Sequence, residues 1–370
     1  MTFYKLQIKD IRAETADCVS VSFDISDDLK PLFAYQAGQY LTLRTFIEGE
    51  DVRRSYSLCS SPLDNEWRVA IKKVESGVFS TFGHTQLKKG DWLDVMPPMG
   101  HFTLPKTLDV ETDVETDVET LHCNVSTYTR YVFFAAGSGI TPILSILKTV
   151  LKSNPESHCT LIYGNRNAAS IIFREEIEGL KNKYLNRFQI FHVLSRERVD
   201  SELGSGRLDK AKIEYFIQKT PEILRGGNFY ICGPFDMIQD IKSVLLEYEI
   251  SPKNIHFELF NAPNANKKIE KKAVDLSKTH IVTIKLDGLT FDVPTPEGMS
   301  ILDAAQRVGA DLPYACKGGV CCTCRAKLLE GNVEMEVNYA LTEEETAVGF
   351  ILTCQAVPKS ERLVVSFDVK

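Results

Sequence analysis

The sequence predicts three successive domains: a small antiparallel β-barrel, an α/β domain with a parallel sheet, and a C-terminal domain built around four cysteines. The first hundred residues contain short runs in which apolar and polar residues alternate, such as Leu41–Phe46 and Trp67–Ile71, punctuated by Gly and Pro. This pattern is typical of antiparallel strands in small barrels. From Tyr131 onward, strand-like and helix-like stretches alternate, which predicts a parallel sheet with helices on both faces.

The size and composition of the chain indicate how many domains it has and which kinds of partner and compartment to expect. A chain of 370 residues is long enough for two or three domains, each with its own core. The net charge of −7 and the lack of a long basic run argue against nucleic-acid binding. The N-terminus lacks the apolar segment of a secretory signal, and no apolar run is long enough to span a bilayer. We therefore expect a cytoplasmic protein without a membrane partner, and six scattered cysteines suit its reducing conditions: Cys18, Cys59, Cys123, Cys159, Cys232 and Cys322.

Two polar segments separate the domains. Residues Asp109–Thr120 repeat the tetrapeptide Asp-Val-Glu-Thr three times. With one apolar residue in four, this segment cannot build a core, and we interpret it as an insertion. A second segment, Asn261–Lys278, is rich in Asn, Lys and Ala and reads as a linker. The expected boundaries are 1–108 for the barrel, 109–127 for the insertion, 128–262 for the α/β domain, 263–279 for the linker and 280–370 for the C-terminal domain.

The secondary structure of the last two domains follows from the same periodicities. A hairpin is expected to open the C-terminal domain, with strands Ile281–Leu286 and Leu289–Val293 joined through Asp287-Gly288. A short helix over Ile301–Val308 leads to the cysteines. In the α/β domain the expected helices are Pro142–Lys152 and Asp236–Tyr248, and the expected strands are Tyr131–Ala136, Thr160–Tyr163, Gln189–Leu194, Phe229–Cys232 and His256–Leu259.

The cysteine spacing predicts a [2Fe–2S] cluster. Cys316, Cys321 and Cys324 form a C-x4-C-x2-C run, and Cys354 supplies a distant fourth thiol, which is the plant-type arrangement. Two irons that share two sulfides still need two thiolates each, and the glycines after Lys317 allow the loop to approach the cluster closely. A zinc site or a chance group of thiols is the alternative, although zinc favours paired C-x2-C hooks. Cys322 is expected to be a spare thiol that faces away from the irons.

A nucleotide site is predicted at the start of the α/β domain. The stretch Tyr131–Pro142 runs from a buried strand through Gly137-Ser138-Gly139 into a helix, with Thr141 as a candidate N-cap and Pro142 at the first helical position. Such a helix N-terminus can bind a pyrophosphate. Pro142 occupies the third glycine position of G-x-G-x-x-G, which disfavours a strict Rossmann dehydrogenase. The alternative is that the two glycines only form a tight turn.

Two further short motifs carry candidate chemistry. Cys232-Gly-Pro ends a strand where ligands bind in open α/β folds, although a buried core cysteine is the simpler interpretation. Arg54-Ser-Tyr56-Ser57 offers a cation, an aromatic ring and a small hydroxyl on one strand, the groups that a flavin nucleotide needs. Taken alone, this tetrapeptide could equally be an exposed strand.

The motifs occur together in the order and spacing of a known family. Arg54–Ser57, Gly77–Ser80, Gly137–Pro142 and Cys232–Pro234 resemble those of the ferredoxin–NADP reductase family. With the C-terminal cysteines, the chain resembles the reductase components of multicomponent oxygenases. The resemblance implies an antiparallel six-stranded FAD-binding β-barrel, a parallel-sheet α/β domain for NADPH and a C-terminal β-grasp ferredoxin domain.

The resemblance also implies roles for the residues of the flavin site. Arg54 would contact the FAD phosphate, Tyr56 would pack on the isoalloxazine, and Ser57 would hydrogen-bond near N5. Gly77, Val78 and Ser80 would hold the FAD pyrophosphate.

In the α/β domain, Gly137, Ser138, Gly139 and Thr141 would bind the nicotinamide nucleotide, and Cys232 would lie near the hydride-donating carbon. Glu258 and Phe260 are weaker candidates near the flavin, with structural roles as the alternative. Of the residues implied by the resemblance, Ser57, Cys232 and Glu258 are the candidates for a catalytic role.

The preferred nucleotide is expected to be NADPH rather than NADH. Ser195 and Arg196 follow the third strand of the α/β domain and offer a hydroxyl and a guanidinium to a 2′-phosphate. Arg166 and Arg207 add positive charge. The alternative is that these arginines are solvated surface residues.

The expected function is electron transfer from NADPH to FAD, then to the [2Fe–2S] cluster and finally to a diiron oxygenase. The blocks Pro313–Cys324, Val333–Ala340 and Ile351–Gln355 most resemble reductases that serve the epoxidation of an aromatic acyl-CoA in phenylacetate degradation. Alternatives are a reductase for another oxygenase (a Rieske dioxygenase, or a steroid or phenol hydroxylase), a redox-sensing module, and a zinc-binding interaction protein.

Overall fold

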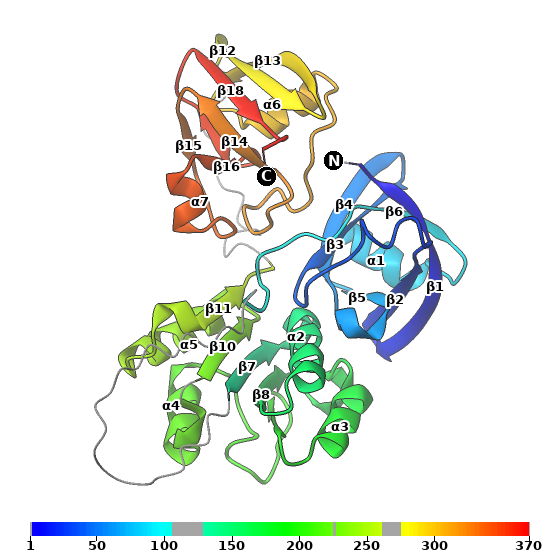
Figure 1. Ribbon diagram of the computed structural model, residues 1–370, viewed down its shortest axis with the longest axis vertical. Helices are drawn as coiled ribbons and strands as arrows, with labels where there is room; N and C mark the ends of the chain where they lie inside the picture. The colour runs from blue at the N-terminus through cyan, green and yellow to red at the C-terminus, as the bar shows by residue number, and fades with distance from the viewer. Residues whose placement is uncertain (1, 106–128, 225–226, 261–274, 370) are drawn as a thin grey trace.

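The computed structural model describes residues 2–105, 129–224, 227–260 and 275–369 (Figure 1). The three predicted domains are present, and the C-terminal domain lies beside the β3–β4 side of the barrel. The Asp-Val-Glu-Thr repeat and most of the expected linker fall outside the described residues. Within those residues, no helix has the length and apolar character needed to cross a membrane.

The N-terminal domain is the predicted antiparallel barrel. Its six strands follow the order β4-β3-β6-β1-β2-β5, and a bridge between Leu58 and Val69 brings the last strand back to the first. Alternate residues such as Leu41, Val69 and Ile71 fill the interior, and Phe79 from helix α1 packs against them. The elements are β1 (Tyr4–Thr15), β2 (Cys18–Asp24), β3 (Tyr40–Ile47), β4 (Glu50–Ser57), β5 (Trp67–Lys72), α1 (Val78–Thr85) and β6 (Trp92–Val95).

The second domain is a five-stranded parallel sheet in the order β11-β10-β7-β8-β9. Alternating residues of β7 point to opposite faces: Phe133 packs toward α2 and α3, and Phe134 packs toward α4 and α5. The chain first adds β8 and β9 on one side of β7 and then β10 and β11 on the other. The gap between β7 and β10 is therefore the topological switch point, where open α/β sheets bind ligands.

The predicted strands and helices of this domain are confirmed to within a few residues. They are β7 (Arg130–Ala136), α2 (Ile140–Ser153), β8 (His158–Asn165), α3 (Arg174–Lys183), β9 (Phe188–Leu194), α4 (Lys210–Lys219), β10 (Gly227–Cys232), α5 (Phe235–Glu247) and β11 (Ile255–Glu258).

The C-terminal domain has a mixed sheet, β13-β12-β18-β14-β16, crossed by helix α6. Its hairpin turn is at Asp287 and Gly288 as predicted, and both residues have positive φ, as a type I′ turn requires. The elements are β12 (Asp275–Leu286), β13 (Leu289–Glu297), α6 (Ile301–Arg307), β14 (Arg325–Glu330), β15 (Val333–Met335), α7 (Glu343–Ala347), β16 (Phe350–Leu352), β17 (Ala356–Pro358) and β18 (Arg362–Ser366).

One boundary differs from the prediction. Strand β12 begins at Asp275, inside the segment that was expected to be linker. Backbone pairing continues past an irregularity from Thr279–Pro296 to Asp275–Glu297. This extension is polar and lacks the apolar alternation by which a strand is recognised, so the sequence pattern did not reveal it.

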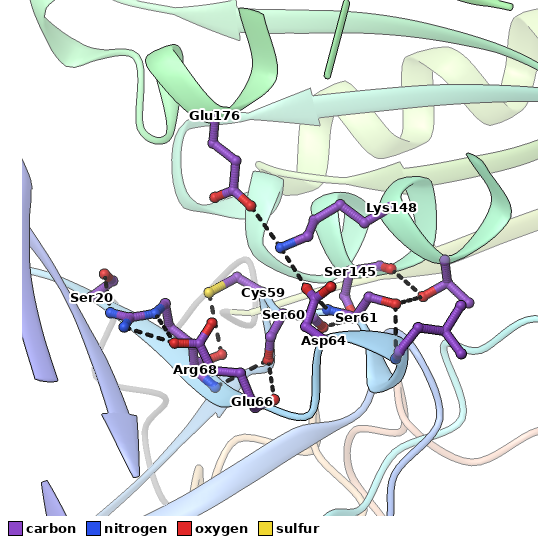
Figure 2. Close-up of polar contacts among 12 residues, drawn as sticks. Ser20, Cys59, Ser60, Ser61, Asp64, Glu66, Arg68, Ser145, Lys148 and Glu176 are labelled. Carbon is purple, nitrogen blue, oxygen red and sulfur yellow. Dashed lines mark hydrogen bonds and ion pairs between the residues drawn. The ribbon is translucent and has the colours of Figure 1, made fainter. Parts of the chain in front are cut away.

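Helix α2 joins the barrel to the α/β domain through a buried polar network (Figure 2). Lys148 Nζ lies 2.8 Å from Asp64 of the barrel and 2.6 Å from Glu176 of α3. Ser145 Oγ donates to the Ser60 carbonyl at 2.6 Å, one turn before Lys148 on the same helix. These contacts fix the α/β domain against the edge of the barrel.

We expect Lys148→Met to destabilise the protein because it removes the cation that lies between the carboxylates of Asp64 and Glu176, leaving Asp64 paired with Lys152. The predicted loss in free energy of unfolding is about 2–3 kcal/mol, measured by chemical denaturation. Lys152→Met is the control, because Lys152 also pairs with Asp64 but its side chain is 29% exposed, and it should cost less than about 1 kcal/mol. Equal losses for the two variants would contradict the role of Lys148.

Candidate functional site

The four predicted cysteines meet in two pairs. Cys321 Sγ donates to Cys316 Sγ at 3.1 Å, and Cys324 forms a hydrogen-bonded pair with Cys354. No three His, Cys, Asp or Glu side chains among the described residues are grouped so that they could hold one metal ion. One pair of thiols per iron is what a [2Fe–2S] cluster requires, whereas a zinc ion needs four ligands around one point. The donor set therefore fits the cluster.

The loop between the first two cysteines turns backbone N–H groups toward the first sulfur. The Cys321 thiol, and then the backbone N–H groups of Gly318, Val320 and Cys321, donate to Cys316 and lower its pKa to about 6, while the same thiol pairing raises the pKa of Cys321. Gly319 has φ of +71°, and a Cβ there would lie 2.9 Å from the Val337 carbonyl oxygen. Because thiolates are the iron ligands, a loop that turns backbone N–H groups toward a sulfur is suited to bind the cluster.

Cys322 lies apart from both pairs. Its Sγ contacts the Ala340 carbonyl oxygen at 3.2 Å, and burial raises the pKa of the thiol to about 12. This geometry supports the interpretation of Cys322 as a thiol that does not bind iron.

The candidate FAD site is formed by β4 and the start of α1. Tyr56 is partly buried, with its ring centroid 5.6 Å from that of Phe79, and the Arg54 side chain is exposed. Gly77 is the N-cap of α1, so the free N–H groups of Val78 and the following residues can receive a phosphate. Ser80 Oγ donates to the Gly77 carbonyl and accepts from the backbone N–H of Val74, each at 3.2 Å. Ser80 therefore holds the turn that presents these N–H groups.

The three candidate catalytic residues come from two domains. Ser57, at the end of β4, donates from Oγ to Glu258 Oε2 at 3.0 Å. Cys232 pairs with Glu258 in the register of β10 and β11, and its side chain is fully buried. Burial raises the pKa of Glu258 to about 8, opposed by the hydrogen bond from Ser57. Burial, and then the charge of Glu258, raise the pKa of Cys232.

A groove of about 920 Å³ lies at the topological switch point of the parallel sheet. Most of the residues predicted to bind the nicotinamide nucleotide line it, together with Arg207 and Phe260: Gly137, Ser138, Gly139, Arg166, Ser195 and Arg196. A Cβ on Gly139 would lie 2.1 Å from the Cys232 carbonyl oxygen, so only glycine allows this turn to approach β10 so closely. The groove fits a dinucleotide phosphate at its glycine turn.

The position of Thr141 differs from the predicted N-cap. It is buried within α2, which begins at Ile140, and the N-cap is Gly139. Residues Gly137–Gly139 form a 3₁₀ turn that continues directly into the helix, and Thr141 Oγ1 donates back to the Ser138 carbonyl at 3.0 Å. Thr141 therefore supports the turn from behind rather than capping the helix or lining the groove, and Pro142 is not the first helical residue.

Several residues at these sites were not predicted from the sequence. Lys72 and Asn165 line the nucleotide groove, and Asn165 directly precedes the predicted Arg166. Tyr40 and Thr42 contact Thr323 between the second and third ligand cysteines of the loop, at 3.2 and 3.5 Å between hydroxyl oxygens. Asn165 could have been found by its position beside Arg166, whereas no local signal marks Lys72, Tyr40 or Thr42.

Comparison with known proteins agrees with this arrangement. Residues 5–104 match the oxidoreductase FAD-binding domain, 133–243 the oxidoreductase NAD-binding domain and 284–359 the 2Fe-2S iron-sulfur cluster binding domain. Phthalate dioxygenase reductase, described as a modular structure for electron transfer from pyridine nucleotides to [2Fe–2S], shares the fold, with a TM-score of 0.59 and 22% identity over 99% of this chain and 98% of that one. Fold and site thus define a flavin- and iron–sulfur-containing oxidoreductase.

Two relatives specify the family. A subunit of 1,2-phenylacetyl-CoA epoxidase from Escherichia coli K12 is 39% identical over all of this chain and 99% of its own. The ferredoxin reductase component of 3-ketosteroid-9-alpha-monooxygenase from Rhodococcus rhodochrous is 32% identical over 98% of this chain and 96% of its own. The chain belongs to this family of reductase components of multicomponent oxygenases. This confirms the expected fold, the FAD and [2Fe–2S] domains and the nucleotide-binding domain.

Replacement of the neighbouring thiols tests the ligand set. We expect Cys321→Ala to lose the cluster, because one iron would keep a single protein thiolate, while Cys322→Ala should keep about two irons per chain. Iron and acid-labile sulfide analysis with visible absorption spectra measures both. A cluster that survives in Cys321→Ala but not in Cys322→Ala would contradict the pairing.

The raised pKa of Glu258 predicts a pH-dependent stability. Its pKa rises from 4.5 to about 8 on folding, so the folded state holds the proton more tightly than the unfolded state. The stability that this bound proton contributes is lost as the pH rises through about 8. Glu258→Gln, which cannot ionise, should gain stability relative to the unsubstituted protein between about pH 5 and about pH 9. Denaturation curves across this range measure the difference in free energy of unfolding between the two proteins. A difference that does not change with pH would contradict the raised pKa of Glu258.

Proposed function

We propose that this chain passes electrons from NADPH through FAD and a [2Fe–2S] cluster to a diiron oxygenase, the phenylacetyl-CoA epoxidase of phenylacetate degradation. The observation that carries this proposal is the 39% identity to the subunit of that enzyme from Escherichia coli, which extends over the whole chain. Bound FAD would convert the two electrons of a hydride into single electrons for the cluster. We also place the reaction in the cytoplasm, since the cysteines of the described residues are free thiols.

The residues of this chain would hold and align the two nucleotides. We assign Arg54 and the N-terminus of α1 to the FAD phosphates and Tyr56 to the flavin ring. Ser57, joined to Glu258 by a hydrogen bond, would fix the flavin edge where the barrel meets the α/β domain. Cys232 and the turn at Gly139 would place the nicotinamide beside that edge, because the turn packs directly against the backbone of Cys232.

The proposed preference for NADPH rests on three arginines of the groove. Arg166, Arg196 and Arg207 all line it. The backbone N–H of Arg196 donates to the Arg166 carbonyl at 2.8 Å, which holds two of these loops together. A guanidinium binds a phosphate through two parallel hydrogen bonds, and NADH has no 2′-phosphate to use this charge.

We expect Arg196→Ala to reduce the preference for NADPH over NADH, measured as the ratio of kcat/KM values. Loss of a charge-assisted hydrogen bond of about 1.5–3 kcal/mol corresponds to about 10- to 100-fold. Arg198→Ala is the control, because Arg198 is an exposed arginine two residues away that does not line the groove. An unchanged ratio in Arg196→Ala would contradict the role.

The partner is tested by reconstitution. The purified chain is added to an extract of its own organism that lacks only this protein, and NADPH-dependent loss of phenylacetyl-CoA and oxygen uptake are followed. Restored consumption of the thioester supports the proposal. Reduction of flavin and cluster by NADPH without loss of the thioester would leave the reductase chemistry intact and reject the epoxidase as partner.

A steroid hydroxylase is the second candidate partner. It is favoured by the 32% identity to the 3-ketosteroid-9-alpha-monooxygenase reductase over 98% of this chain. The same extract supplied with a 3-ketosteroid in place of the thioester distinguishes the two, since only the partner's substrate will be consumed.

A further inference from the structure

One face of the β3–β4 hairpin, the face turned away from the barrel core that Leu41 and Leu43 fill, carries polar side chains. In the register of the two strands, Thr42 pairs with Ser55 and Arg44 pairs with Arg53, so their side chains share one face. With Tyr40, these residues form what we call the docking face. Three of these residues form hydrogen bonds with the C-terminal domain. Tyr40 and Thr42 contact Thr323, and Arg53 contacts Asp311 and Leu312.

Arg53 is the most buried charge of the docking face, with 4% of its surface exposed. Its guanidinium is held within the barrel by Asp51, with Nη2 to Oδ2 at 2.6 Å and Nε to Oδ1 at 3.1 Å. The same guanidinium reaches the C-terminal domain, where it donates to Asp311 Oδ1 at 2.6 Å and to the Leu312 carbonyl at 3.3 Å. It also lies 4.4 Å from the ring centroid of Tyr314.

The segment that Arg53 contacts leads directly into the cluster loop. Tyr314 is followed by Ala315 and the first candidate iron ligand, Cys316. On the other side of the loop, the hydroxyl of Tyr40 lies 3.2 Å from that of Thr323, and Tyr40 packs with Ala315 and Cys321 in a buried cluster. The docking face therefore holds the cysteine loop at two points, and Arg53 provides the charged one, at the start of the loop.

The neighbouring side chains of β4 point the other way. Because side chains alternate along a strand, Arg54 and Tyr56 lie on the face opposite Arg53, against α1, where we place FAD. A single strand thus presents one face to the flavin site and the other to the cysteine loop.

We propose that Arg53 is a positioning residue for electron transfer from FAD to the cluster, holding the C-terminal domain in its accepting position against β4. The inference rests on the proposed electron path. A guanidinium suits this place because its three nitrogens reach Asp51, Asp311 and a carbonyl in fixed directions, whereas all the donors of an ammonium lie on one atom. Asp311 is 65% exposed, so this ion pair alone is weak, and the buried contacts to Leu312 and Tyr314 give the geometry.

The test is single-turnover reduction of the cofactor-loaded full chain by NADPH, with flavin and cluster followed separately. We expect Arg53→Met to slow transfer from flavin to cluster by at least about tenfold, since loss of charge-assisted hydrogen bonds to Asp311 and Leu312 lowers the population of the docked state by about that factor. Flavin reduction by NADPH should change less than about twofold, because Arg53 is not part of the nucleotide groove. Asp311→Asn should slow the same step less, and its effect should be non-additive with that of Arg53→Met.

Arg68→Met is the matched control. Arg68 is similarly buried, with a side chain 4% exposed, and binds two carboxylates, but both Asp10 and Glu66 belong to the barrel. A structural role alone would make the two variants behave alike. Hydrogen exchange of the backbone amides of residues 312–316, apart from the imide of Pro313, gives a readout without turnover, and it should be faster in Arg53→Met but not in Arg68→Met.

Unchanged flavin-to-cluster transfer in Arg53→Met, or equal slowing in Arg68→Met, would overturn the proposal. Failure of the proposed function would be visible in the unsubstituted chain, as a flavin that NADPH does not reduce. The exchange measurement needs no electron donor, so it still decides whether Arg53 docks the C-terminal domain.

Discussion

The alternation of side chains along β4 is the constraint on which the arrangement of the three domains depends. Neighbouring residues of a strand face opposite sides, so Arg53 and Arg54 serve different parts of the molecule. Arg53 is buried against the C-terminal domain, and Arg54 is exposed on the side of the proposed flavin site. At the end of the same strand, Ser57 reaches Glu258 of the α/β domain. One strand of eight residues therefore meets all three domains.

The two interfaces of the barrel differ in chemistry. Toward the α/β domain, α2 contributes apolar side chains to a core shared with barrel residues such as Cys59 and Phe102, and Lys148 adds a buried ion pair. Toward the C-terminal domain, the contacts are mainly hydroxyls and guanidinium groups. A shared apolar core fixes two domains rigidly, whereas a more polar contact resembles transient interfaces. This difference suits a C-terminal domain that receives electrons at the barrel and also passes them to a separate oxygenase, while the two nucleotide-binding domains stay fixed to each other.

Local patterns predicted the architecture and singled out the three cysteines of the loop, because each depends on residues close in sequence, whereas Cys354 is distant from them. The strands around Phe133 and Phe134 follow from apolar periodicity, and the thiol spacing identifies the cluster loop. The contacts between domains could not be predicted this way. Tyr40 and Thr323 lie 283 positions apart, and nothing near either residue indicates the other. Thr141 was wrongly predicted as an N-cap because a glycine turn can pass into a helix without a side-chain cap. The early start of β12 could not be recognised because the residues there are mainly polar.

Electron flow from nicotinamide to flavin to cluster is the order on which the proposed function depends. It is tested by comparing anaerobic reduction by NADPH of the complete chain with that of the same chain stripped of FAD. We expect the complete chain to lose flavin absorbance first and to gain the signal of a reduced cluster afterwards. The FAD-free chain should leave its cluster oxidised. Reduction of the cluster at an undiminished rate without FAD would contradict this order.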